Sequence, residues 1–310
     1  MHPLIKKPSD KIETNFVKAL YYGAPGIGKS TYGFTAPAPV LFDFDDGVKR
    51  VQPNDRREYV PITCWEDVES VIDSGLPEFE SIIIDTAGKC LQYMAQDIIK
   101  KAPPKAKLSW QGNLTQQGYG QLKTRFQQFL LKVNQHKKHI IFLAHDKEVA
   151  DGDVSFVRPD IVGASLGILL TEMDIVGYIS MSEGKRVISH DPSEKYYGKN
   201  SCQLEPMIET GLLPIAKMID RYKANQDKIH EIGLKYKQTL ADAQSRLNSC
   251  NTLDEFNAAL KELAEGSHIW DSKLVVRNYA KQRLTDLGYE YRNGQYYKVE
   301  KVEQAAIPMP

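Results

Sequence analysis

The sequence predicts an α/β protein with a mainly parallel, twisted β-sheet flanked by helices. Short segments rich in β-branched and aromatic residues alternate with segments whose apolar residues recur at helical spacing. The first apolar segment runs directly into a glycine-rich turn at 23–30. Strands that alternate with helices form a parallel sheet with helices on its faces, which gives the fold class.

The strands are expected where four to six residues are predominantly apolar and β-branched or aromatic. These segments are 17–22, 40–44, 59–62, 81–84, 139–144 and 175–179. Between them, Thr-Cys-Trp-Glu at 63–66 has the form of a capping box, which predicts the start of a helix. A longer helix is expected over 119–133, where Leu122, Phe126 and Val133 share one face.

The pattern changes from about Leu213 onwards. Apolar residues from Ile229 to Leu247 recur every three or four positions, which predicts a long helix. A second capping box at 252–255 and a helix over 272–287 follow, and Asn-Gly at 293–294 predicts a hairpin between tyrosine-rich arms. We therefore expect an arm (1–15), an α/β core (16–213), a mostly helical region with a terminal hairpin (214–300) and a flexible tail (301–310).

Composition excludes several classes of protein. The chain has 310 residues with 40 Lys and Arg against 40 Asp and Glu, and 42% of its residues are hydrophobic, as in ordinary globular proteins. No apolar run approaches the roughly 20 residues that cross a bilayer, and no signal-peptide core follows the first lysines, so we expect a cytoplasmic protein without membrane contact. The four cysteines have neither zinc nor disulfide spacing.

The glycine-rich turn has the spacing of a phosphate-binding P-loop. In Gly23-x-x-x-x-Gly28-Lys29-Ser30 the glycines allow backbone N–H groups to point at phosphate oxygens. Lys29 is expected to reach the β- and γ-phosphates of ATP, and the Ser30 hydroxyl to hold Mg²⁺. The predicted nucleotide-binding residues are Gly23, Ala24, Pro25, Gly26, Ile27, Gly28, Lys29, Ser30 and Thr31.

Polar residues at the ends of three other expected strands complete the predicted site. Asp85 ends an apolar strand in the Walker B manner and is expected to hold Mg²⁺, partly through water. Asp45 or Asp46, in a cluster of acids at 43–46, is the expected base for water attack, although a solvated loop is an alternative for this cluster. His145 ends a strand whose carboxyl end should face the same crevice, where it could contact the γ-phosphate.

The zero net charge conceals two segments of opposite sign. Residues 40–97 contain thirteen acidic and five basic residues, whereas residues 98–145 contain nine basic residues and no acidic ones. Lysines beside an aromatic residue are suited to single-stranded DNA, because charge binds phosphates and rings stack on bases. The candidates here are Lys101, Lys105, Lys107 and Trp110; the alternative is a solvated loop with Trp110 packed on the core.

The order of these motifs resembles the ATPase core of RecA-like recombinases, and more closely the compact phage ATPases that include Sak-type single-strand annealing proteins. The resemblance covers about residues 16–213. It implies that Asp45 activates water, although this family usually has Glu there, and that His145 stands where RecA has Gln. It also implies DNA-binding loops at 101–118 and 146–163, the second with Lys147 and Arg158, and cations from the next subunit in the place of Lys195 or Lys199.

The predicted function is therefore an Mg²⁺-dependent ATPase that cleaves the β–γ phosphoanhydride and acts on single-stranded DNA in phage recombination or replication. The resemblance further implies a homo-oligomer, ring or filament, a single-strand-binding or replication protein as partner, and the bacterial host cytoplasm as location. The alternative is a nucleotide-switched assembly protein with little hydrolysis and no DNA binding. A small-molecule kinase is less favoured, because between Arg57 and Arg186 the only arginines are Arg125 and Arg158.

Overall fold

The computed structural model describes residues 15–103, 108–151, 154–201, 203–292 and 295–299, together with His2, Ile5, Lys7 and Asp10. The chain divides into two compact units, one of Glu13–Gln226 and one that begins, in its main part, at Asp227. The division falls within one long helix, α6 (Ile215–Asn248). Each unit is described by itself.

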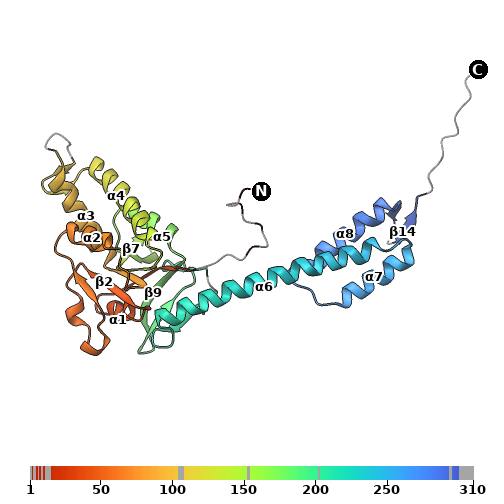
Figure 1. Cartoon of the computed structure of the whole chain (residues 1–310), viewed down its shortest axis with the longest axis horizontal. Coiled ribbons are helices and arrows are strands. Elements are labelled where there is room, and N and C mark those ends of the chain that lie inside the picture. The colour runs from red at the N-terminus through yellow and green to blue at the C-terminus, as the bar shows by residue number, and fades with distance from the viewer. Residues whose placement is uncertain are drawn as a thin grey trace, which may run out of the picture. The chain divides into compact units, whose positions relative to one another are not determined.

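The first unit is built on one ten-stranded sheet (Figure 1). Its strands follow the order β12-β10-β9-β1-β7-β4-β2-β3, with β11 paired to β9 and β8 paired to β7. The pairs β9/β1, β1/β7, β7/β4, β4/β2 and β2/β3 are parallel, and the remaining pairs are antiparallel. The strands are β1 (Lys18–Gly23), β2 (Pro39–Asp43), β3 (Tyr59–Pro61), β4 (Ser81–Asp85), β7 (His139–Asp151), β8 (Val154–Pro159), β9 (Ile175–Ser182), β10 (Lys185–Ser189), β11 (Lys199–Asn200) and β12 (Met207–Glu209).

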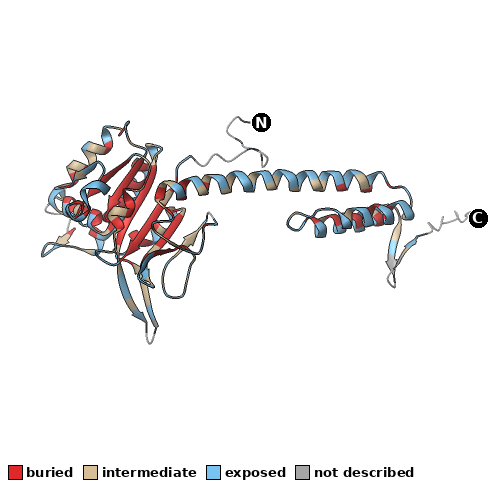
Figure 2. Cartoon of the chain, turned by 90° about the horizontal axis from the view of Figure 1, so that it is seen from below, coloured by how far each residue is buried: buried red, intermediate tan, exposed pale blue. Residues whose placement is uncertain are grey.

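Helices cover both faces of this sheet, and alternate residues of each strand face opposite helices. On one face, residues such as Leu20, Phe42 and Phe142 pack against α2 (Trp65–Asp73), α3 (Ala87–Lys101), α4 (Gln116–Gln135) and α5 (Ala164–Glu172). On the other face, residues such as Tyr21 and Ile141 pack against α1 (Lys29–Gly33) and the first turns of α6. Figure 2 shows the strands as the buried layer. The predicted fold class is confirmed.

The second unit contains three helical segments and a strand pair. The latter part of α6, α7 (Leu253–Glu265) and α8 (Ser272–Asp286) enclose a small core that includes Leu247 and Phe256. The antiparallel pair β13 (Tyr289–Arg292) and β14 (Gln295–Lys298) follows. The helical region and its terminal strand pair are thus confirmed, while Asn293 and Gly294 lie outside the described residues. Within the described part of the chain, no helix is long and apolar enough to cross a membrane.

Two local expectations are corrected. The capping box predicted at 63–66 is shifted by one residue, because helix α2 has Cys64 as its N-cap and the Asp67 carboxylate accepts the backbone N–H of Cys64 at 3.0 Å. The loop expected at 146–163 is largely a hairpin, because β7 continues past the sheet to Asp151 and pairs with β8. A short strand pair, β5 (Ser109–Trp110) and β6 (Asn113–Leu114), and the 3₁₀ helices η1 (Val48–Arg50) and η2 (Pro53–Asp55) complete the fold.

Candidate functional site: a phosphate-binding loop at the carboxyl ends of the strands

The predicted P-loop follows β1 at the carboxyl edge of the parallel strands. Gly23 ends β1, where it pairs with His145 of β7 on one side and Ile179 of β9 on the other. A Cβ atom at Gly23 would lie only 2.3 Å from the carbonyl oxygen of Ile179, so only glycine allows this close approach. Gly26 and Gly28 have φ angles of +78° and +92°, which other residues rarely adopt. These glycines position the loop for backbone contacts with phosphate.

The Lys29 side chain is buried beneath this loop. Its ammonium group donates hydrogen bonds to the carbonyl oxygens of Gly23 at 2.8 Å and Ala24 at 2.9 Å, and lies 3.3 Å from Nδ1 of His145. Burial lowers the pKa of Lys29, while the carboxylates of Asp85, Asp146 and Asp45 oppose that shift. The cation is therefore held at the position from which a P-loop lysine reaches the phosphates.

Ser30 and Asp85 meet directly, as their motifs predict. The Ser30 hydroxyl donates to Oδ2 of Asp85 at 2.5 Å, although the two residues are 55 positions apart. Burial raises the pKa of Asp85 to about 6, and the nearby carboxylates of Asp45 and Asp43 act in the same direction. A hydroxyl and a carboxylate beside a phosphate site are oxygen ligands that suit Mg²⁺, which keeps waters and phosphate oxygens as its other ligands. Among the described residues no cluster of three or more His, Cys, Asp and Glu side chains could hold a metal by itself.

The three acidic residues at the end of β2 and directly after it have different environments. Asp43 is buried, and its carboxylate accepts the backbone N–H groups of Gly47 and Val48 at 2.8 and 3.0 Å, so it stabilises the start of η1. Asp46 has φ +55°, is exposed and forms an ion pair with Lys49. Of the three, Asp45 is the one that lines the pocket beside the phosphate loop. Of the two predicted bases, Asp45 is thus placed beside the site and Asp46 is paired away from it.

His145 connects Lys29 with Asp45. Its Nδ1 faces the Lys29 ammonium, and its Nε2 lies 3.6 Å from Oδ2 of Asp45. Because an ammonium group only donates hydrogen bonds, a neutral imidazole accepts at Nδ1 and carries its proton on Nε2, which faces Asp45. The contact with His145, more than any other, lowers the pKa of Asp45. Asp45 is therefore held as a carboxylate at the mouth of the site.

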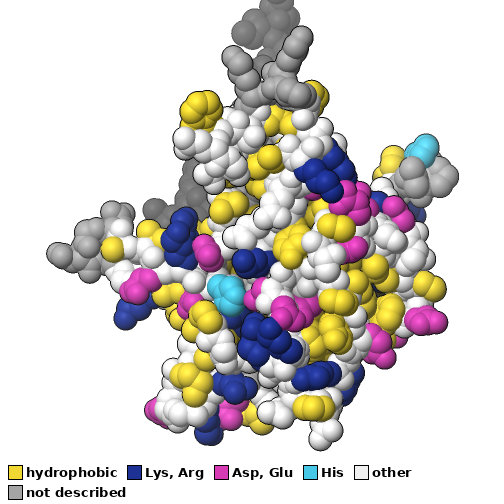
Figure 3. Space-filling view, turned by 90° about the vertical axis from the view of Figure 1, so that its left-hand side faces the viewer, with side chains coloured by type: hydrophobic (Ala, Val, Ile, Leu, Met, Phe, Trp, Pro, Cys, Tyr) yellow, Lys and Arg dark blue, Asp and Glu magenta, His cyan; other side chains and the backbone are white. Residues whose placement is uncertain are grey.

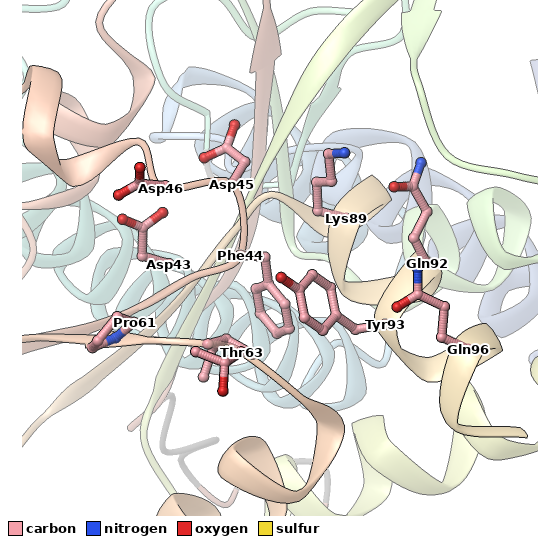
Figure 4. Close-up of a pocket in the computed structure, with 11 residues that line it drawn as sticks. Asp43, Phe44, Asp45, Asp46, Pro61, Thr63, Lys89, Gln92, Tyr93 and Gln96 are labelled. Atoms are coloured by element: carbon pink, nitrogen blue, oxygen red, sulfur yellow. The ribbon is translucent and has the colours of Figure 1, made fainter. Parts of the chain in front are cut away.

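Two pockets share this mouth. The smaller one, of about 120 Å³, lies between the P-loop and the segment after β2, and its lining includes Lys29, Asp45, Asp85 and His145. The larger one, of about 570 Å³, lies on the other side of Asp45. Figure 4 shows the larger pocket, with Asp43, Asp45 and Asp46 following one another along one wall and side chains of α3, Lys89, Gln92 and Gln96, on the other. Asp45 lines both pockets.

Of the predicted DNA-binding residues of the first loop, the structure describes Lys101 and Trp110. The Lys101 ammonium forms ion pairs with Asp97 at 2.9 Å and Glu66 at 3.2 Å, so its charge is already compensated. Trp110 lies on the β5/β6 strand pair and 73% of it is exposed, which is the opposite of the core packing considered as its alternative. Lys105 and Lys107 lie outside the described residues.

The residues of the second loop are brought together. Lys147 and Arg158 are directly opposite on the hairpin of β7 and β8, and Lys147 is exposed. The Nε atom of Arg158 is buried without a hydrogen-bond partner in the described part of the chain.

Of the two cations expected to act on a neighbouring subunit, Lys199 donates to the carbonyl oxygens of Leu170 and Thr171 at 3.3 Å, at the end of α5. Lys195 lies in the segment before β11, where its carbonyl oxygen accepts the Val157 N–H at 2.7 Å.

Two arginines near the P-loop were not predicted. Arg50, at the end of η1, lines the smaller pocket. Arg186, on β10, lies against Gly28, where a Cβ atom would be 2.8 Å from its Nη1. Neither arginine belongs to a known sequence motif. Arg50 reaches the site from the 3₁₀ turn after β2, and Arg186 reaches it from the hairpin of β9 and β10. The sequence signal for Arg50 is its position five residues after Asp45, and for Arg186 it is the Ser-Glu-Gly-Lys segment at 182–185, whose glycine is typical of a turn.

The fold and this site define a P-loop nucleotide-binding protein. The model of a family described as an AAA domain matches residues 15–202, and the chain belongs to that family. One similar solved structure is titled the crystal structure of the RadB recombinase. The two chains are 14% identical, and the match covers 56% of this chain and 79% of the RadB chain with a TM-score of 0.33. A comparison with curated proteins finds no match. Family and site together indicate a chain that binds ATP.

Proposed function

We propose that the protein is an Mg²⁺-dependent ATPase whose turnover is coupled to single-stranded DNA. One observation carries the ATPase half: the Ser30 hydroxyl and the buried Asp85 carboxylate are in contact directly beside Lys29 of the P-loop. These are the three side chains that a P-loop NTPase needs for phosphate and metal. Lys29 and Ser30 begin helix α1 after β1 and Asp85 ends β4, so the fold brings them together although β7 lies between the two strands.

Each side chain has a separate task in the proposed reaction. Lys29 would exchange its carbonyl partners for phosphate oxygens, and Ser30 and Asp85 would hold the Mg²⁺ ion. Bound Mg²⁺ supplies charge neutralisation at the phosphate oxygens. Asp45 orients the attacking water and accepts its proton, since it is the unprotonated carboxylate at the mouth of the pocket. His145 positions Asp45 through Nε2 and contacts the Lys29 ammonium group through Nδ1.

The DNA half of the proposal is supported by the hairpin of β7 and β8. Two positive side chains directly opposite on an antiparallel pair repel one another, so Lys147 and Arg158 are unfavourable neighbours unless an anion binds between or beside them. The hairpin begins at Asp146, immediately after His145. A change at the phosphate site can therefore reach the hairpin through a continuous strand. The exposed Trp110 is available for stacking on a base.

The positive side chains do not form one extended basic surface on the face shown in Figure 3. In the space-filling view of Figure 3, Lys and Arg side chains are interspersed with Asp and Glu, and no large region of one sign appears on that face. We therefore infer weak, salt-sensitive DNA binding by the monomer, and propose that a homo-oligomer supplies the additional contacts. Such an assembly would act in recombination or replication, where a single-strand-binding or replication protein is the expected partner.

Replacement of Lys29 tests the ATPase half. Lys29→Ala should abolish ATP hydrolysis in the presence of Mg²⁺ and weaken ATP binding, because it removes the ammonium group held beneath the loop. Lys132→Ala is a matched control, since Lys132 pairs with Asp73 on the helices covering the sheet. Circular dichroism should show that both variants are folded. Tight ATP binding by the wild-type protein without any turnover would contradict the ATPase proposal and support a nucleotide-switched assembly protein instead.

A further inference from the structure

Arg50 lies in the wall of the smaller pocket, opposite the P-loop. It ends the 3₁₀ helix η1, which begins at Val48, two residues after the acidic cluster at 43–46. The same pocket is lined by Gly28, Lys29 and Asp85. Its volume of about 120 Å³ is well below the roughly 300–1,000 Å³ of whole small-molecule sites, so it has the size for phosphate groups and not for a base. The Arg50 side chain thus lies where the phosphates of a bound nucleotide are expected.

The guanidinium of Arg50 has one acidic neighbour. Its Nη2 lies 3.8 Å from Oδ2 of Asp45, and 63% of the side chain is exposed. No other described carboxylate is within ion-pair distance of Arg50. The Asp45 side chain is only 14% exposed, but a 3.8 Å ion pair with a largely exposed arginine contributes little to stability, so the contact can be exchanged at small cost. Arg50 is therefore a weakly paired cation whose partner in this structure is the proposed base.

Gly47 makes room for this arrangement. A Cβ atom at Gly47 would lie 2.7 Å from Oδ1 of Asp45 and 3.2 Å from Nη2 of Arg50. The φ angle of Gly47 is −80°, so the requirement is for space and not for an unusual backbone. The carboxylate and the guanidinium therefore share the space above a residue without a side chain, and both face the pocket.

Binding of a nucleoside triphosphate in this pocket would be favoured by a second positive side chain beside Lys29. Lys29 is one positive charge, and Asp43, Asp45 and Asp85 are three carboxylates close by. A nucleoside triphosphate adds several negative charges, of which the ion held by Ser30 and Asp85 neutralises a part. Guanidinium groups bind phosphate oxygens with two parallel hydrogen bonds, which an ammonium group does not provide. Arg50 is the arginine that lines this pocket together with the P-loop.

We propose that Arg50 binds the γ-phosphate of ATP from the side opposite Lys29 and releases Asp45 from its ion pair as it does so. The γ-phosphate is assigned because Arg50 and Asp45 are neighbours, and the water that attacks this phosphate must lie beside Asp45. ATP then moves the guanidinium from the carboxylate to the phosphate, and Asp45 becomes available to water. The inference rests on the proposed ATPase function and deepens it with a positioning and phosphate-binding residue.

The test compares Arg50→Gln with Lys49→Gln. Lys49 is its neighbour in η1 and carries the same charge, but it pairs with Asp46 outside the pocket. Binding of ATP and of ADP is measured by titration with Mg²⁺ at one salt concentration. Arg50→Gln should lose about tenfold or more in affinity for ATP, the size of a charge-assisted hydrogen bond, and much less for ADP. Lys49→Gln should bind both nucleotides as the wild-type protein does.

Two results would overturn the inference. Equal affinities for ATP in Arg50→Gln and Lys49→Gln would show that Arg50 does not contact phosphate. Equal losses for ATP and ADP in Arg50→Gln would remove the γ-phosphate assignment. Lys29→Ala in the same titration keeps the proposed function separate: if that variant binds ATP as tightly as the wild-type protein, the nucleotide site itself is wrong, whatever Arg50 does.

Discussion

Three side chains form a line of contacts from the phosphate loop to the end of β2. The Lys29 ammonium contacts Nδ1 of His145, and Nε2 of His145 faces Asp45. In the proposed reaction, a phosphate that attracts Lys29 would change the hydrogen-bond partner of His145, and therefore the position of Asp45. At the scale of single residues, we therefore propose that phosphate binding and water activation are coupled through one imidazole, whose two nitrogens face different partners.

A second histidine controls stability and not chemistry. His139 is buried at the start of β7, and its Nδ1 accepts the backbone N–H of Val17 at 3.0 Å. Burial, with a contribution from Lys223, lowers the pKa of His139 to about 4. In the unfolded chain this histidine titrates near its ordinary value of 6.5, so the unfolded state binds more protons between those values. Its contribution to stability is complete above pH 6.5 and falls as the pH is lowered towards 4.

We therefore predict a pH-dependent difference between the wild-type protein and His139→Asn, a variant that keeps a hydrogen-bond acceptor. Between about pH 7 and about pH 5, the free energy of unfolding of the wild-type protein should fall by about 1 to 2 kcal/mol more than that of the variant. Urea unfolding at both pH values measures this. Parallel losses in the two proteins would show that His139 is not the titrating group.

The sequence predicts the P-loop residues and Asp85 because their spacing is dictated by phosphate and metal chemistry. It does not separate Asp45 from Asp46. That distinction depends on the left-handed turn at Asp46, the backbone hydrogen bonds of Asp43 and the partner of Lys49, all of which are set by folding. Of the two partners of Lys101, Asp97 lies one turn earlier on the same helix, whereas Glu66 lies on another helix and is brought close only by folding. A basic residue in the sequence therefore indicates a DNA-binding surface only when its ion-pair partners in the folded protein are known.

At the scale of elements, the basic segment packs against the acidic segment. Arg125 of α4 pairs with the buried Asp97 of α3 at 2.5 Å and with Glu69 of α2 at 3.2 Å, and its guanidinium lies over the ring of Trp65. The contacts join three helices on one face of the sheet. Acidic residues of 40–97 and basic residues of 98–145 therefore form ion pairs with one another in the folded protein. Part of the positive charge that the sequence suggests for DNA binding instead holds helices together.

The hairpin of β7 and β8 is the element on which the DNA proposal depends. Replacing both Lys147 and Arg158 with Ala should weaken binding of single-stranded DNA and reduce its salt dependence, because two phosphate contacts are lost. ATP binding should be unchanged, since neither residue lines the phosphate pocket.

Lys185→Ala is the matched control for this variant, as Lys185 lies on a different hairpin and pairs with Glu209. Fluorescence anisotropy of a labelled oligonucleotide at two salt concentrations measures the effect. If the double variant and the control bind DNA with the same affinity and salt slope, the hairpin is not a DNA-binding element.

At the scale of the whole molecule, α6 belongs to both compact units. Ile215, Met218, Ile219 and Tyr222 are buried in the core of the first unit, and Leu247 is buried in the core of the second. The change in sequence pattern at Leu213 marks the start of this helix and precedes the division at Gln226. Periodicity identifies the helix, but the packing that assigns its first turns to the sheet depends on residues far away in the sequence.

Two truncations test this assignment. A chain that ends at Gln226 should fold and bind ATP. A chain that ends at Leu213 loses the four buried side chains of α6, each contributing about 1.5–3 kcal/mol, which together approach the stability of a typical domain. It should be unfolded or aggregated, as measured by thermal unfolding and ATP titration. Equal stability of the two truncated chains would show that α6 is not part of the first unit's core.

The central claim is that ATP turnover at this site is linked to single-stranded DNA. The most direct measurement is the rate of ATP hydrolysis by the full chain with Mg²⁺, with and without single-stranded DNA, at several salt concentrations. We expect hydrolysis that requires Lys29 and rises when DNA is added at low salt. A rate that is the same with and without DNA at every salt concentration, together with no DNA binding, would contradict it.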